Sequence, residues 1–95
     1  MTSVIWAPQA IEDVEAIRTY VARDSAHYAD LLVERIVAAI GRLETFPRSG
    51  RVVPEVGDES LREVVYESYR IVYRLKPSAV EIITVFHGAR LLRLE

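Results

Sequence analysis

The chain has 95 residues, 51% of them hydrophobic, and a formal net charge of −2. This length predicts a single domain over residues 1–95, and this apolar content suits a folded core rather than a disordered chain. The lack of cysteine excludes disulfides and thiolate chemistry, and with only two histidines it argues against a structural zinc site. We therefore expect neither a metal nor a cofactor.

The sequence also lacks the segments that direct a protein to a membrane. No window approaches the roughly 18 consecutive apolar residues that a membrane-spanning helix needs. Residues 1–4 lack the basic and apolar regions of a signal peptide. We expect a cytoplasmic protein with no membrane partner.

Charge is spread unevenly along the chain. Residues 1–41 carry three arginines against six acidic residues, whereas residues 42–95 carry nine basic against eight acidic residues. A dedicated nucleic-acid-binding domain usually has a clear basic excess. The composition therefore disfavours non-specific binding to RNA or DNA and leaves a local basic patch open.

The N-terminal half predicts one strand and two helices. Residues 3–6 form the strand, and Pro8 can open a helix because its missing N–H is not needed in the first turn. Apolar residues at helical spacing continue this helix to about residue 23 and build a second from about 25 to 45, where Pro47 stops it. The short connection predicts an antiparallel helical hairpin.

The C-terminal half predicts three strands. Residues 48–60 lack periodicity and contain glycine and proline, so we expect a loop there. Strands are predicted over 61–66, 69–75 and 80–86, and the tight turns between them favour an antiparallel meander. The fold class is therefore α+β, in the order β-α-α-β-β-β, with the hairpin packed on one face of an antiparallel sheet.

Two arginines lie in the middle predicted strand. Arg70, Val72 and Arg74 share one face, and the apolar residues between them face the helices more plausibly. Arg70 and Arg74 are therefore predicted on the open face of the sheet. They either form cross-strand pairs with acidic residues or await an anionic or acidic partner. The candidate acidic residues are Glu63, Glu67 and Glu81.

The last predicted strand ends in His87-Gly88-Ala89-Arg90. The reference pKa of histidine lies near 7, so His87 can serve in proton transfer, and the alternative is a strand-end histidine bonded to backbone. A short apolar tail follows, which either completes the core or is covered by a partner. Its leucines are Leu91, Leu92 and Leu94.

These motifs, in this order, resemble the RelE/ParE superfamily, the small toxins of bacterial type II toxin-antitoxin modules. The resemblance covers most of the chain. It is carried by Trp6, Pro8, Ala10, Asp13, Ile17 and Tyr20, by Phe46-Pro47 and Gly50-Arg51, by Leu61-Arg62-Glu63 and Tyr69-Arg70-Ile71-Val72-Tyr73, and by His87-Gly88-Ala89-Arg90. The resemblance implies a toxin that a partly disordered antitoxin holds inactive. A homodimer and a heterotetramer of two toxins and two antitoxins are both open.

The superfamily has two branches, and the resemblance leaves both open. RelE-like members cut mRNA in the ribosomal A site, whereas ParE-like members poison DNA gyrase and block replication. Arg70 and Arg90 match two arginines of the RNA-cutting branch, and Arg62 falls near one of its lysines. If the chain is RelE-like, the resemblance implies a catalytic set of Arg62, Arg70, His87 and Arg90.

Other features are more similar to the ParE branch. Val64 occupies a second basic position of the RNA-cutting branch, and that branch's terminal tyrosine falls beyond the end of the chain. The near-neutral charge points the same way, because docking on ribosomal RNA depends on neutralising phosphates. The favoured reading is a gyrase inhibitor without catalysis of its own, and the alternative partners are the ribosome and mRNA. The residues expected to bind partners are Arg70, Arg74, His87, Arg90, Leu91, Leu92 and Leu94.

Overall fold

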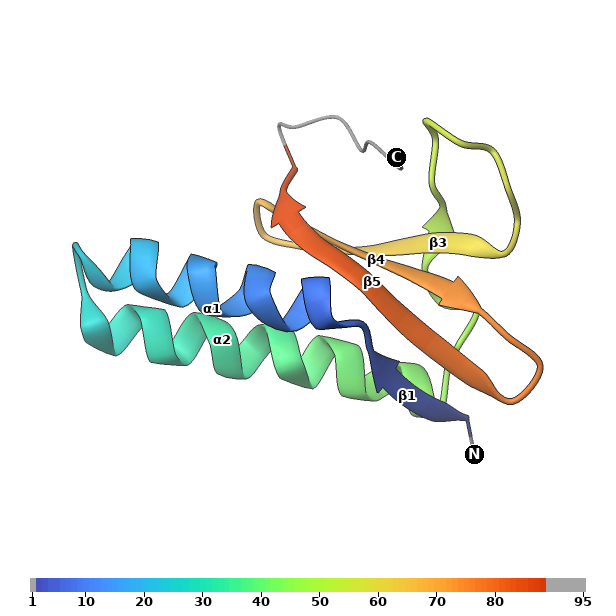
Figure 1. Cartoon of the computed structure of the whole chain (residues 1–95), viewed down its shortest axis with the longest axis horizontal. Coiled ribbons are helices and arrows are strands. Elements are labelled where there is room, and N and C mark those ends of the chain that lie inside the picture. Colours follow the sequence, from blue (N-terminus) through green and yellow to red (C-terminus); the bar gives the residue numbers. More distant parts are fainter. Residues whose placement is uncertain (1, 89–95) are drawn as a thin grey trace.

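The computed structural model of the chain describes residues 2–88, and the predicted site residues Arg90, Leu91, Leu92 and Leu94 lie outside them. A helical hairpin packs on one face of a five-stranded sheet (Figure 1). The elements are β1 (Ser3–Trp6), α1 (Pro8–Ala22), α2 (Ala26–Gly41), the short 3₁₀ helix η1 (Arg42–Glu44), β2 (Arg51–Val52), β3 (Leu61–Tyr66), β4 (Tyr69–Leu75) and β5 (Ala79–His87). This order confirms the predicted α+β class.

The sheet is mixed rather than antiparallel throughout. Its strand order is β1-β5-β4-β3-β2, and β3, β4 and β5 form the predicted antiparallel meander. β1 instead lies parallel to β5 at the far edge. The helical hairpin separates β1 from the other strands, and so long a connection permits parallel pairing. The predicted loop over residues 48–60 also differs, because it contains the two-residue strand β2.

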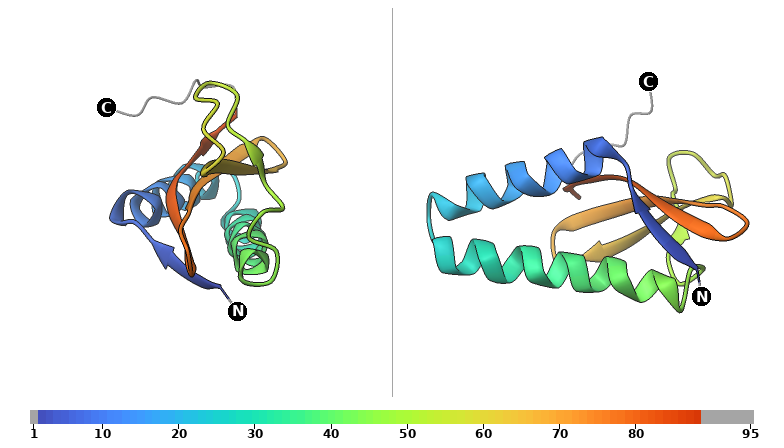
Figure 2. Two further views of the ribbon diagram at one scale, coloured as in Figure 1. Left: turned by 90° about the vertical axis from the view of Figure 1, so that its right-hand side faces the viewer. Right: turned by 60° about the horizontal axis from the view of Figure 1, so that its bottom comes forward.

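The two helices begin at recognisable residues and lie antiparallel (Figure 2). Pro8 is the first residue of α1, and the Ser25 side chain caps α2 by accepting a hydrogen bond of 3.1 Å from the Tyr28 amide. Their apolar faces pack against β4 and β5 in the main core. This core contains Ala10, Val14, Leu32, Val33, Ile36, Ile40, Leu43, Ile71, Tyr73, Val80, Ile82 and Val85. Within residues 2–88, no helix has the length and apolar character to cross a bilayer.

The Asp13 side chain connects α1 to β5 by hydrogen bonds, beyond the point where β1 ends. The last backbone bond between these strands runs from the Ala7 amide to the Ile82 carbonyl, at 2.9 Å. Farther along β5, Asp13 Oδ2 accepts hydrogen bonds from the Val85 amide at 3.1 Å and from Thr84 Oγ1 at 2.5 Å. The carboxylate therefore continues the hydrogen bonding that β1 no longer supplies, and it fixes α1 across the sheet.

The second face of the sheet is covered in part. A small core of Val53, Leu61 and Val72 lies there, with Ile83 and Phe86 packed against it. Residues 53–60, which we call the covering loop, lie on this side, away from the helices (Figure 1). The predicted alternation of β4 is confirmed, but the face that carries Arg70 is not open. The covering loop folds back over it because Val53 is buried against β3 and β4.

Candidate functional site

Arg70 lies near the start of β4, on the face under the covering loop. Its Nε donates a hydrogen bond of 2.7 Å to Glu63 Oε1. Its Nη1 and Nη2 donate to the two carboxylate oxygens of Glu55, at 2.6 and 2.7 Å. The side chain is only 8% exposed. Glu55 thus forms a bidentate ion pair with the guanidinium, which is the strongest geometry for this kind of pair.

Glu63 links this pair to a second arginine. Its side chain is fully buried, and Oε2 accepts a hydrogen bond of 2.6 Å from Arg51 Nε. The strand register explains the arrangement, because Glu63 pairs directly with Arg51 of β2 and lies diagonally across from Arg70 of β4. The result is an alternating chain of charges, Arg51–Glu63–Arg70–Glu55, which we call the ion-pair chain.

The surroundings of Arg70 favour its charged form. The hydrogen bonds that Arg70 donates to Glu55, and then those to Glu63, raise the pKa of Arg70 above its ordinary value against the opposing effect of burial. The guanidinium carbon also lies 5.2 Å from the centre of the Phe86 ring, in cation–π geometry. A surface hollow of about 380 Å³ borders the site. It is lined by Arg51, Pro54, Glu55, Arg70 and Gly88.

Arg74 lies on the same face but is more exposed, at 39% of its side chain. It donates a hydrogen bond of 3.2 Å to Ser60 Oγ and lies 4.0 Å from Asp58 Oδ2. The acidic residues expected to pair across strands have different roles. Glu63 does pair with Arg70, whereas Glu67 accepts a hydrogen bond from the Tyr28 hydroxyl and Glu81 pairs with Lys76.

The predicted RNA-cutting residues do not converge on one site among residues 2–88. Arg62 pairs with Tyr73 on the helix side of the sheet, where its Nη1 donates to the Gly50 carbonyl at 3.1 Å. His87 is exposed, and its ring meets the Tyr69 ring edge-on at 5.8 Å, also on the helix side. Arg70 lies on the other face. Arg62 and His87 are therefore at opposite ends of β4, and both are separated from Arg70 by the sheet.

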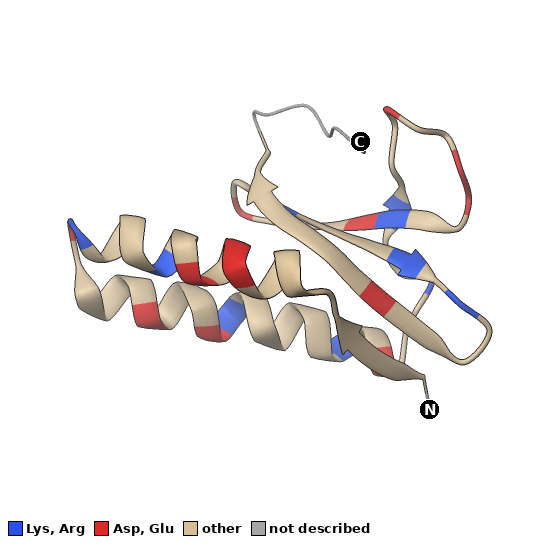
Figure 3. Ribbon diagram, viewed as in Figure 1, with Lys and Arg blue, Asp and Glu red and all other residues tan. Residues whose placement is uncertain are grey.

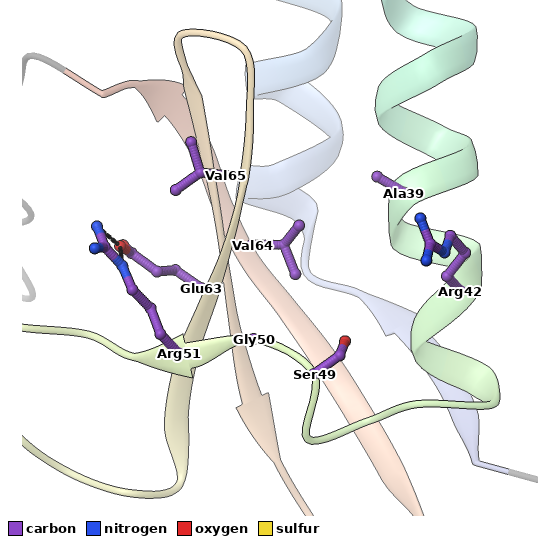
Figure 4. A pocket seen from close by; sticks show the side chains of 8 residues that line it. All are labelled: Ala39, Arg42, Ser49, Gly50, Arg51, Glu63, Val64 and Val65. Carbon is purple, nitrogen blue, oxygen red and sulfur yellow. Dashed lines mark hydrogen bonds and ion pairs between the residues drawn. The ribbon is translucent and has the colours of Figure 1, made fainter.

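A second hollow, of about 370 Å³, wraps around the outer edge of β3 (Figure 4). We call it the edge groove. Val64 turns toward α2 in this view, and Val65 turns to the opposite side. The lining residues are Ala39, Arg42, Ser49, Gly50, Arg51, Glu63, Val64 and Val65.

The edge groove exposes unpaired strand backbone. β2 pairs with Arg62 and Glu63 and therefore stops short of Val65. Val65 is 52% exposed. The Leu61 carbonyl accepts from the Val53 amide at the outer edge, and backbone direction alternates along a strand. The N–H and C=O of Val65 therefore also point outward, with no strand beside them in residues 2–88.

Gly50 fits tightly into the wall of the edge groove. Its amide donates a hydrogen bond of 3.0 Å to the Tyr73 hydroxyl, which itself donates to the Pro47 carbonyl at 2.7 Å. A Cβ atom at Gly50 would lie 2.6 Å from the same hydroxyl oxygen. Burial raises the pKa of Tyr73 above its ordinary value, so the hydroxyl keeps the proton that it donates.

Sequence reasoning missed both Glu55 and the edge groove. Glu55 lies in a segment without periodicity, and only its acidic type hinted at an arginine partner. Val65 carried a better signal. If Val64 and Tyr66 face the helices, Val65 lies on the opposite face, where an apolar side chain is exposed to solvent unless another segment covers it. Among the described residues, no three histidine, cysteine, aspartate or glutamate side chains gather as a metal site requires.

The fold is that of a small α+β domain, and comparison with known proteins defines its family. A family model described as the ParE toxin of the type II toxin-antitoxin system, parDE, matches residues 4–92. The chain therefore belongs to the ParE toxin family within the RelE/ParE superfamily. Such a toxin has a cognate antitoxin as its partner.

Individual relatives agree with this assignment. The chain is 34% identical over 92 residues to a Caulobacter vibrioides protein named Toxin RelE2. The aligned region covers 96% of this chain and 100% of that relative. Among solved structures, a chain of the chromosomal ParDE toxin-antitoxin system from P. aeruginosa superposes with a TM-score of 0.76. That match covers 92% of this chain and 96% of the other at 23% identity, so it supports the fold alone.

Proposed function

We propose that this single-domain toxin acts in the cytoplasm as a ParE-like inhibitor of DNA gyrase, blocks replication without catalysis of its own, and is neutralised by its antitoxin. One observation carries the proposal. The guanidinium that would hold a scissile phosphate is gripped at two points by Glu55 and at a third by Glu63. A phosphate would have to displace a bidentate carboxylate to reach it.

The distribution of charge supports the same conclusion. Acidic and basic residues intermix over the sheet and loops rather than forming one basic face (Figure 3). With a net charge of −2, the chain lacks the excess of cations through which RNA-binding proteins gain most of their affinity. The match to a family model described as the ParE toxin adds weight.

The alternative function is a RelE-like, ribosome-dependent mRNA endoribonuclease. It is favoured by the name of the 34% identical relative, Toxin RelE2, and by Arg70 and Arg90 at positions that resemble catalytic arginines. In this alternative Arg62 and His87 would also act on RNA. They would have to do so across the thickness of the sheet from Arg70, or after the ion-pair chain had rearranged.

The antitoxin is proposed to bind at the edge groove, the helical hairpin and the C-terminal leucines. Among residues 2–88 no strand lies beside the outer edge of β3 at Val65, and such an edge is suited to the addition of an extended partner segment. A disordered chain can wrap several such surfaces of a small domain at once. The complex proposed is a heterotetramer of two toxins and two antitoxins.

A supercoiling assay with purified gyrase tests the proposed function. Stoichiometric toxin should inhibit supercoiling and trap cleaved DNA, and prior mixing with the antitoxin should abolish both effects. Intact supercoiling with no trapped DNA would contradict the proposal for that gyrase.

The matched assay for the alternative is primer extension on a translated mRNA. There, codon-linked cuts that disappear in Arg70→Ala would favour the ribonuclease.

A further inference from the structure

The two carboxylates on Arg70 are held very differently. Glu63 belongs to β3 and its side chain is fully buried, whereas Glu55 belongs to the covering loop and its side chain is 22% exposed. Glu63 is also fixed from the other side by Arg51. Glu63 is thus a permanent partner of Arg70, and Glu55 is the partner that another group can replace.

The covering loop is built so that it can move away at Glu55. The amides of Val56 and Gly57 both donate to the Val53 carbonyl, at 3.2 and 2.9 Å, so this part of the backbone is bonded to the loop itself. Gly57 has a φ of +73°, which glycine adopts without strain and which turns the chain sharply. One tie from this turn to the sheet is the Glu55 carboxylate on Arg70. Moving the turn away from the sheet therefore breaks this ion pair and leaves the backbone bonds of the turn intact.

The charge of the opened site indicates what would bind there. The ion-pair chain holds two arginines and two glutamates and is neutral. Without Glu55, the three remaining members of the ion-pair chain are two arginines and one glutamate, beside the hollow that Arg51, Pro54 and Gly88 border. One bidentate fork with one excess charge suits a single carboxylate. An RNA strand would bring a phosphate at every nucleotide toward a protein of net negative charge, with Glu63 and the displaced Glu55 nearby.

We propose that the Arg70 fork is a carboxylate-binding site which Glu55 occupies in the free toxin, and which an aspartate or glutamate of the antitoxin occupies in the complex. The exchange replaces one bidentate ion pair by another, so the buried guanidinium is never left without a carboxylate. This inference rests on the proposed toxin-antitoxin partnership and adds the chemistry of one contact. It makes Glu55 an internal competitor of the antitoxin.

Calorimetric titration of the toxin with its antitoxin tests the exchange. Glu55→Gln keeps the size of the side chain but removes the competing charge, so we expect it to bind the antitoxin about tenfold more tightly than the wild type. Glu59→Gln, on the same loop and exposed, is the matched control and should bind within about twofold of the wild type. Circular dichroism should show a wild-type fold for both, because Arg70 keeps Glu63. Unchanged or weaker binding by Glu55→Gln would overturn the proposal.

A second experiment identifies the incoming group. Each aspartate and glutamate of the antitoxin is replaced by asparagine or glutamine and titrated against the wild-type toxin and against Glu55→Gln. For one antitoxin position, the advantage of Glu55→Gln should disappear, which is the non-additivity of groups that share a partner. Additive effects at every position would overturn the exchange. So would a gain in affinity for a single-stranded RNA oligonucleotide rather than for the antitoxin, because it would mark a phosphate site.

The outcome is independent of the gyrase assay. Tighter antitoxin binding by Glu55→Gln together with intact supercoiling would leave the carboxylate site standing and remove the proposed target. Inhibited supercoiling with no effect of Glu55→Gln on antitoxin binding would support the proposed target and overturn the carboxylate site.

Discussion

Replacing Glu63 by glutamine removes the central charge of the ion-pair chain and changes the volume of the side chain very little. Glu63 is fully buried between Arg51 and Arg70, with nitrogen–oxygen distances of 2.6 and 2.5 Å. Arg70 would then lose the carboxylate that β3 supplies and keep that of Glu55, which lies on the covering loop. Removing one partner of a buried ion pair costs about 3–5 kcal/mol, because the remaining charge stays buried without full compensation. We expect Glu63→Gln to lose about 3 kcal/mol, near the lower end of this range, because glutamine can still form a hydrogen bond.

This loss is large for a domain of this size. Small domains unfold with a free energy of about 5–15 kcal/mol, and each 1 kcal/mol shifts their Tm by about 4–8 °C. The expected fall in Tm for Glu63→Gln is therefore about 12 °C or more. Urea unfolding followed by the fluorescence of Trp6, the single tryptophan, measures the same change because Trp6 packs against the main core.

Two further variants make the reasoning refutable. Glu59→Gln removes an exposed charge of the covering loop and should change stability by less than about 0.5 kcal/mol. The double variant Glu63→Leu with Arg70→Met replaces the buried pair by apolar residues of similar volume, and it should recover most of the loss. A loss below about 1 kcal/mol in Glu63→Gln, or a double variant as unstable as the sum of its single variants, would show that this ion pair is not the buried anchor described above.

Three other predictions concern the remaining parts of the site. Gly50→Ala should lower the free energy of unfolding by about 1–3 kcal/mol, because its Cβ would lie 2.6 Å from the Tyr73 hydroxyl oxygen. The urea midpoint measures this loss, and an unchanged midpoint would mean that the residues around Gly50 move to accommodate the methyl group. Val65→Glu should leave Tm within a few degrees of the wild type but weaken antitoxin binding at least tenfold in calorimetry, and wild-type affinity would remove the edge groove from the interface. Hydrogen bonds from the Ser60 amide and hydroxyl lower the pKa of Asp58 below its ordinary 3.8, so they stabilise the fold above that pH and the benefit is lost as pH falls through the lowered pKa. Urea midpoints of the wild type and Asp58→Asn should therefore differ at neutral pH and converge below pH 3.8, and a constant difference would contradict this.

Local sequence signals were sufficient for most of the elements. Pro8 marks the start of the first helix, Pro47 follows the end of the helical hairpin, and the alternation around Val72 correctly separates the two faces of β4. These signals act over a few residues, where backbone sterics and hydrogen bonding decide the structure. The place of β1 beside β5 depends instead on contacts between residues far apart in the chain. No local pattern around residues 3–6 encodes that choice.

The same distinction explains what was missed at Arg70. Alternation predicts the face on which a side chain lies, but it does not predict what covers that face. Glu55 reaches Arg70 from a loop 15 residues away in sequence, and the loop lacks periodicity. The approach is determined by the burial of Val53 and by the need to neutralise a guanidinium that is largely out of water.

For the predicted RNA-cutting set, part of the geometry was available from the sequence. A two-residue turn at 67–68 fixes the register of β3 and β4, and counting back along it pairs Arg62 with Tyr73. This pairing places Arg62 on the helix side, opposite Arg70. The position of His87 was not available in this way, because a bulge opposite Val72 and Tyr73 shifts the register of β5 and changes which of its residues face the helices.

The most direct test of the account is which synthesis stops first when the toxin is induced without its antitoxin. Cells are pulse-labelled with thymidine and with methionine at short intervals after induction. A gyrase inhibitor should stop thymidine incorporation within minutes while methionine incorporation continues. Immediate loss of methionine incorporation with continued DNA synthesis would contradict the account, and it would identify the arginines of β3 and β4 as parts of a ribonuclease instead.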